Sequence, residues 1–166
     1  MTAEQFLKQL ENREVNFEKS RLRDVSLAMQ DDLPALLSDR QCVHYGLEIS
    51  HLEHGTWTGI QEWWLLINRH LLKATAKIEE RNTGKDLIAE YQSWSLSSLQ
   101  SAGLRTTRQS SHLRSVTLEM VFPSVPPLKV TAQHPLNDAN KLDPDALLLF
   151  ARHLFALAPQ AEAPKS

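Results

Sequence analysis

The sequence predicts an α+β fold, in which a small antiparallel sheet packs against a long helical hairpin and a C-terminal helix. Two observations predict it. In some stretches apolar side chains recur at every second residue, which is typical of a strand with one buried face. In others they recur with the 3.6-residue period of an amphipathic helix. The predicted strands and helices are segregated along the chain, which favours helices packed on one face of an antiparallel sheet.

Four strands are expected. Residues 43–50 give the clearest pattern, because their apolar side chains all fall on one face of a strand: Val43, Tyr45, Leu47 and Ile49. The same alternation predicts strands at 113–122 and 128–133, and the intervening "PSVPP" suits a β-hairpin with a loose turn. A strand near 22–29 is also expected, although the apolar residues there fit a helical spacing as well.

A long helix is predicted at 59–82. Thr58 stands three residues before Gln61, which is a capping-box spacing. The apolar residues that follow keep the helical period: Ile60, Trp63, Trp64, Ile67, Leu71, Ala74 and Ile78. Gly84 suits the left-handed position at which helices end, and a second helix is expected at 84–101. Two helices joined by a short turn favour an antiparallel hairpin.

The last predicted element is a helix at 144–158. Asp143 can cap it, Pro144 fits the first helical position, and Asp145 interacts favourably with the helix dipole. Because nothing in the composition marks a domain boundary, we expect a single domain over 1–158. Residues 159–166 are then a flexible C-terminal tail.

Composition narrows the class of protein. The 166 residues carry a net charge of −2, which argues against a wholesale polyanion binder. The single cysteine excludes a disulfide framework within the chain and fits a reducing compartment. The N-terminus does not resemble a secretory signal, and no apolar run approaches the roughly 20 residues that a spanning helix needs. We therefore expect a cytoplasmic protein without membrane contact.

The densest group of potential metal ligands comprises Cys42, His44, His51 and His54. Four such residues within one short stretch could in principle bind zinc. Their spacing, however, is not that of known zinc enzymes, and the simpler interpretation is a set of polar residues on an edge strand. The sequence also lacks a nucleophile elbow, a phosphate loop and a dinucleotide glycine pattern. We therefore assign no catalytic residue, metal or cofactor.

A basic loop is predicted at 104–114. It contains Arg105, Arg108, His112 and Arg114, and the surrounding residues 91–118 include no aspartate or glutamate. Its Ser and Thr residues are short polar donors that suit phosphate oxygens. The loop could contact a nucleic-acid backbone or an acidic protein partner, or its arginines could pair with carboxylates elsewhere in the chain.

The leading functional hypothesis is a non-enzymatic adaptor or accessory subunit that acts through protein–protein contacts, with a partner chain or a second copy. It depends on the lack of a recognisable catalytic motif and on the surfaces that the hairpin at 116–132 and the final helix offer. The alternative is an accessory subunit that contacts nucleic acid through the basic loop. The third hypothesis is an enzyme that uses His44, His51 or His54, with or without a metal.

Overall fold

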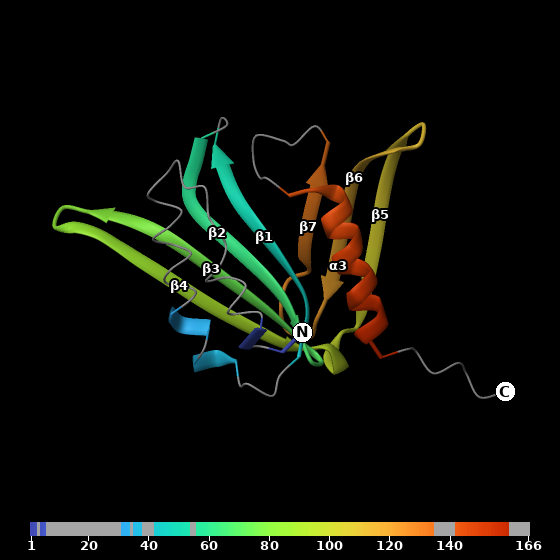
Figure 1. Cartoon of the computed structure of the whole chain (residues 1–166), viewed down its shortest axis with the longest axis horizontal. Coiled ribbons are helices and arrows are strands. Elements are labelled where there is room, and N and C mark those ends of the chain that lie inside the picture. Colours follow the sequence, from blue (N-terminus) through green and yellow to red (C-terminus); the bar gives the residue numbers. More distant parts are fainter. Residues whose placement is uncertain are drawn as a thin grey trace.

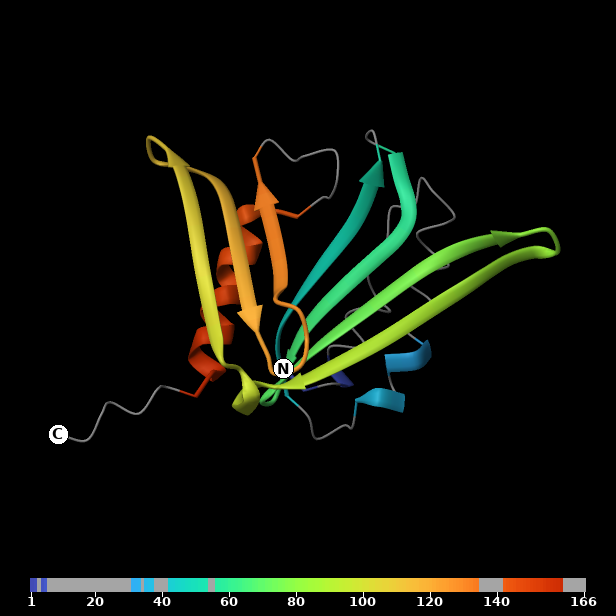
Figure 2. The ribbon, with the colours of Figure 1, turned by 180° about the vertical axis from the view of Figure 1, so that it is seen from behind.

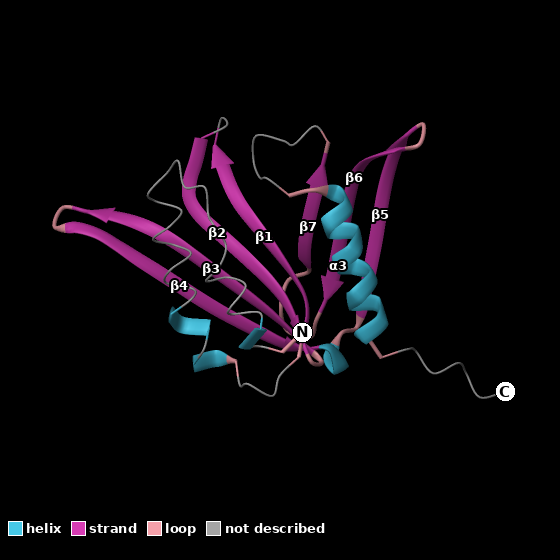
Figure 3. Ribbon diagram, viewed as in Figure 1, coloured by secondary structure: helices cyan, strands magenta, loops and turns pink. Residues whose placement is uncertain are grey.

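The structure is a computed structural model of the chain, and it describes residues 1–2, 4–5, 31–33, 35–37, 42–53, 56–134 and 142–159. These residues form mostly antiparallel β-structure. They comprise seven strands in two sheets, together with one helix of 14 residues near the C-terminus. Figure 3 shows how strongly strands dominate the described part of the chain.

The first sheet is a four-stranded meander in the order β1-β2-β3-β4. Its strands are β1 (Val43–Glu53), β2 (Thr56–Ile67), β3 (His70–Arg81) and β4 (Gly84–Ser95). Each pairs with the next in antiparallel register. The long β3–β4 hairpin projects away from the rest of the molecule (Figure 1).

The second sheet is three-stranded, in the order β5-β6-β7. A short 3-10 helix, η1 (Leu96–Ser98), leads from the first sheet into β5 (Ser101–Gln109), β6 (His112–Val121) and β7 (Leu128–Gln133). The helix α3 (Pro144–Leu157) then packs on β6, β7 and β1. The two sheets fan out from the end of the molecule where η1 lies (Figures 1 and 2). In the second sheet β6 is the central strand, and β5 and β7 are the edge strands.

The predicted α+β fold, with one small sheet packed against a helical hairpin at 59–82 and 84–101, is wrong. The residues of the predicted hairpin form β2, β3, β4, η1 and the first residue of β5. The cause is that the middle of β2 is buried on both faces: Trp63 and Leu65 belong to the core on one side of the sheet, and Trp64 belongs to the core on the other. A strand covered on both sides has a continuous apolar run, which periodicity cannot distinguish from a buried helix.

The two turns that join β2 to β3 and β3 to β4 also differ from the prediction, which placed helical residues at the first and a helix end at the second. Asn68 has a positive φ of 50° in the two-residue turn between Ile67 and His70, which pair across β2 and β3. Asparagine tolerates this conformation better than most residues, which suits a tight β-hairpin. Gly84, read in the sequence as a helix end, has a φ of 147° and instead begins β4 opposite Arg81.

Other predicted elements are present in the structure. The strands expected at 43–50, 113–122 and 128–133 correspond to β1, β6 and β7, and the helix expected at 144–158 corresponds to α3. Asp143 caps α3 as predicted, since its side chain accepts a hydrogen bond of 3.2 Å from the backbone N–H of Asp145. The strand predicted near 22–29 lies outside the described residues, as do residues 160–166 of the predicted tail.

Within the described ranges, the buried apolar residues form two clusters, one on each face of the first sheet. The larger lies between that sheet, the second sheet and α3, and is formed by residues such as Trp64, Leu118 and Phe150. The smaller lies on the opposite face, where Leu33 and Leu37 cover Trp63 and its neighbours. The larger cluster contains side chains from both sheets and from α3. Because α3 packs on β1 of the first sheet and on β6 and β7 of the second, it connects the two sheets.

An aromatic contact fixes α3 against the first sheet. The ring of Tyr45 on β1 stacks on His153 with centroids 5.1 Å apart, and it meets Phe150 edge-on at 6.2 Å. Burial, followed by the nearby charge of Asp143, raises the pKa of Tyr45 above its ordinary value. Tyr45 therefore contributes an apolar ring to this junction and remains neutral at physiological pH.

Candidate functional site

An open groove of about 590 Å³ lies on the surface between α3 and β5. The lining is apolar except for one acid and one base, and consists of Leu104, Asp145, Leu148, Leu149, Arg152 and Phe155. Leu149 and Phe155 are 41 % and 40 % exposed, which is high for large apolar side chains. Scattered apolar residues are normal on a protein surface, but a contiguous apolar groove is typical of a binding site.

The groove follows from how α3 sits on the second sheet. The helix buries Leu147, Phe150, Ala151 and Leu154 and packs chiefly on β6, β7 and β1. The edge strand β5 extends beside the helix, where its residue Leu104 forms the far wall of the groove. Leu104 pairs with the fully buried Leu118, so the wall continues the core outwards to the surface.

The four residues of the predicted basic loop lie on the β5–β6 hairpin, with Arg108, His112 and Arg114 near its tip and Arg105 further along β5, opposite Thr117. Arg105 and Arg108 are on β5, and His112 and Arg114 are on β6, on either side of a turn in which Ser110 has a φ of 55°. All four side chains are exposed. The segment at 104–114 is thus two paired strands and a tight turn rather than a loop.

Two of these basic side chains form hydrogen bonds within the hairpin. Arg108 donates to the carbonyl of Ser111 at 3.5 Å, and Arg114 donates to the side-chain carbonyl of Gln109. Among the described residues, none of the three arginines forms an ion pair with a carboxylate. Within that part of the chain, the positive charge of the hairpin tip is therefore directed to solvent.

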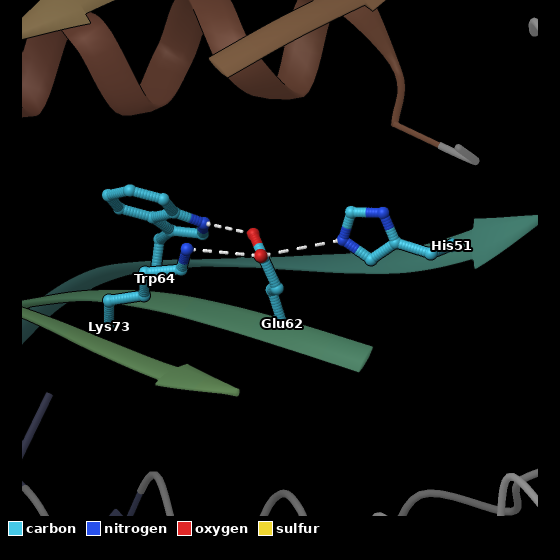
Figure 4. A network of polar contacts seen from close by, with 4 residues as sticks. All are labelled: His51, Glu62, Trp64 and Lys73. Atoms are coloured by element: carbon cyan, nitrogen blue, oxygen red, sulfur yellow. Dashed lines mark hydrogen bonds and ion pairs between the residues drawn. The ribbon is translucent and has the colours of Figure 1, made fainter. Parts of the chain in front are cut away.

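A polar network lies on the face of the first sheet that turns towards α3 (Figure 4). Glu62 is at its centre. Its carboxylate is 3.1 Å from Nζ of Lys73 and 3.6 Å from Nε2 of His51, and it accepts a 3.1 Å hydrogen bond from the indole N–H of Trp64. The Lys73 ammonium also lies 5.1 Å from the centre of the Trp64 ring, within cation–π distance.

The network holds Glu62 as a carboxylate. Burial opposes ionisation of Glu62, but its contacts with His51, Lys73 and Trp64 outweigh burial and lower its pKa from 4.5 to about 2. A base of such low pKa is a weak proton acceptor at neutral pH, so this carboxylate is suited to holding three strands together rather than to general base catalysis.

Sequence reasoning missed this network because its members come from three strands that were read as one strand and one helix. In the sheet, Trp64 stands directly opposite Lys73, and Glu62 stands opposite Ile49. A signal was nevertheless present, because opposite charges on neighbouring strands are common stabilising pairs. It could be recognised only after β2 and β3 had been identified as a hairpin.

The predicted Cys/His group is only partly described. His51 faces Glu62, and His44 is exposed on β1. Cys42 is half-buried, with its Sγ 3.9 Å from the N-terminal amine. No group of three or more His, Cys, Asp or Glu side chains in the described residues is arranged to hold a metal ion, and His54 lies outside those residues.

Comparisons with known proteins give no family for this chain. No protein-family model matches the sequence, and no curated protein is significantly similar to it. Of the helices in the described residues, none is both long and apolar enough to cross a membrane. The surfaces and side chains of the molecule itself are therefore the basis for inferring its function.

Proposed function

We propose that this protein is a non-enzymatic accessory subunit or adaptor that binds a protein chain through the groove between α3 and β5. The observation that carries the proposal is the apolar groove with its exposed Leu149 and Phe155. Burying such side chains against a partner removes apolar surface from water, at about 25 cal/mol per Å². The charges of Asp145 and Arg152 would then lie at the rim of the interface, where polar residues are usual.

The shape of the groove fits a folded or helical protein segment. One wall is a helix face and the other is an edge strand, an arrangement that can accept an amphipathic segment against apolar side chains. The single cysteine suits a reducing compartment, which supports our proposal that the protein and its partner are cytoplasmic.

Replacing Leu149 with aspartate is expected to weaken partner binding by at least about 30-fold, because central interface residues contribute about 2 kcal/mol or more. Affinity purification from the native cells, with quantification of co-purifying chains, measures the effect. The matched control is Leu87→Asp, since Leu87 on β4 is equally apolar and 39 % exposed but lies away from the groove. Equal loss of the same partner in both variants, or in neither, would contradict the proposal.

A second candidate function is contact with a nucleic-acid backbone, supported by the three arginines and one histidine of the β5–β6 hairpin. Arginine side chains are common phosphate ligands, and a protruding hairpin can reach a strand without distorting the fold. Three such contacts would give modest affinity, because the electrostatic part of the binding free energy grows with the number of phosphates that the protein neutralises.

This second candidate predicts salt-sensitive binding of single-stranded DNA or RNA. Three phosphate contacts would weaken binding roughly 15- to 20-fold for a fourfold rise in salt concentration. The Arg105→Ala/Arg108→Ala/Arg114→Ala variant should abolish the anisotropy change of a labelled oligonucleotide. The control is Arg81→Ala/Lys85→Ala at the β3–β4 tip, where the same charges pair with Asp86 and Glu80. A triple variant that binds like the wild type would refute the hairpin tip as a nucleic-acid contact.

A further inference from the structure

We propose that the chain that occupies the groove is a second copy of this protein, with the two α3 helices packed antiparallel about a two-fold axis between Leu148 and Leu149. The inference deepens the proposed function and rests on it in one respect, since it uses the same groove. The pattern of charge along the exposed face of α3 supports this dimer.

Four of the six groove residues form one continuous stripe on α3. Asp145, Leu148, Leu149 and Arg152 line the groove and are spaced three, one and three residues apart, which places them on one side of the helix. The neighbouring side, formed by Leu147, Phe150, Ala151 and Leu154, is buried in the core. A helix with one apolar face in its own core and a second apolar stripe at the surface is suited to packing against another helix.

The stripe is complementary to itself. Asp145 stands three residues before Leu148, and Arg152 stands three residues after Leu149. In an antiparallel pair centred between the two leucines, the Asp145 carboxylate of each copy therefore meets the Arg152 guanidinium of the other. The leucines of both copies meet at the centre. A two-fold interface requires this self-complementarity, because the same surface is presented by both partners.

Other orientations of the same two helices do not match. A parallel pair in register would place Asp145 against Asp145 and Arg152 against Arg152, and like charges across an interface are unfavourable. The antiparallel pair also brings two copies of Phe155 to the ends of the contact, where each 40 % exposed ring can be covered. Both Asp145 and Arg152 are exposed in the single chain, so their ion pairs would form at the rim of the interface.

Sedimentation velocity and light scattering, at protein concentrations up to about 100 µM, test the proposal. The wild type is expected to be a dimer, and Leu149→Asp is expected to be a monomer that keeps the circular dichroism spectrum of the folded wild type but melts at a lower temperature, because dimerisation stabilises the folded state. Leu87→Asp should remain dimeric. A monomeric wild type, or a dimer that survives Leu149→Asp, would overturn the proposal.

Charge exchange tests the antiparallel register itself. Asp145→Arg alone and Arg152→Asp alone each put like charges at both ends of a homodimer, so each variant should dimerise at least about tenfold more weakly than the wild type. An equimolar mixture of the two variants restores both opposite-charge pairs and should form a heterodimer. Failure of the mixture to associate more tightly than either variant alone would overturn the antiparallel arrangement.

The dimer and the accessory role can fail separately. If the wild type is a monomer but Leu149→Asp still loses a different protein partner that Leu87→Asp retains, the groove binds that partner and the self-association is refuted. If the charge-exchange mixture behaves as expected but no other partner depends on the groove, the dimer stands and the adaptor role through this groove is refuted.

Discussion

Replacing Trp64 with alanine is expected to lower the free energy of unfolding by about 3–5 kcal/mol. The Trp64 side chain is 2 % exposed and lies in the core cluster between the first sheet, the second sheet and α3. The substitution removes apolar contacts, leaves a cavity and deprives Glu62 of an indole hydrogen bond at 3.1 Å. Chemical denaturation, followed by circular dichroism and by a second probe to verify two-state unfolding, measures the loss.

Two further variants separate the causes of this loss. Trp64→Phe keeps most of the buried ring but removes the hydrogen bond, so it should cost less, about 1–2 kcal/mol. Leu87→Ala changes a 39 % exposed leucine on β4 and should alter stability by less than about 1 kcal/mol. If Trp64→Ala were no more destabilising than Leu87→Ala, the central position of Trp64 in the core would be refuted.

Replacing Glu62 with glutamine is expected to destabilise the protein by about 1–3 kcal/mol at neutral pH, because it removes the charge that Lys73 and His51 face. Lys73 and His51 retain 24 % and 33 % side-chain exposure, which lets water offset part of the loss. A double-mutant cycle with Lys73→Met isolates the coupling between the two side chains. A coupling indistinguishable from zero would show that the Glu62–Lys73 ion pair adds nothing to stability.

Glu62 also predicts a specific acid sensitivity. Its pKa is about 2 in the folded protein, against an ordinary value of 4.5, so folding favours the ionised form. The stability that Glu62 contributes is therefore fully present above about pH 4.5 and is lost as the pH falls towards 2.

The acid sensitivity is measured by urea denaturation at a series of pH values. The Glu62→Gln variant should lose less stability than the wild type between pH 4.5 and 2. Glu79→Gln is the control, because Lys77 lowers the pKa of Glu79 at an exposed position where ion pairs contribute little. Equal pH dependence of the wild type and Glu62→Gln would contradict this assignment.

The fold prediction was right for residues 43–50 and wrong for residues 59–82, and the two regions differ in how their side chains are buried. Residues 43–50 were recognisable as a strand because their alternation is strict, with Leu47 and Ile49 buried and His44 exposed. Residues 59–82 were not, because β2 is covered on one face by α3 and the second sheet and on the other by Leu33 and Leu37. Burial on both faces erases the alternation on which a strand prediction depends.

Of the candidate functional features, the sequence identified the basic residues but neither the groove nor the polar network. The basic residues Arg105, Arg108 and Arg114 were identified from the local composition of the sequence. Their charge and their closeness in the sequence are the same in a loop as in a strand. The groove at Leu149 and the network at Glu62 were not, since each needs residues from elements that are distant in the sequence. Leu104 and Leu149 are brought together only by the packing of α3 beside β5.

The sequence by itself determined the local features: the cap at Asp143, the helix that follows it, the strands with one solvated face and the positions of charge. Each depends on residues a few positions apart, whose preferences act before any long-range contact forms. Only the tertiary structure decided that residues 59–95 form strands, because β2 is buried on both faces of the sheet and the largely exposed β4 is held by its pairing with β3. It alone also decided that α3 leaves an apolar stripe exposed beside the edge strand β5.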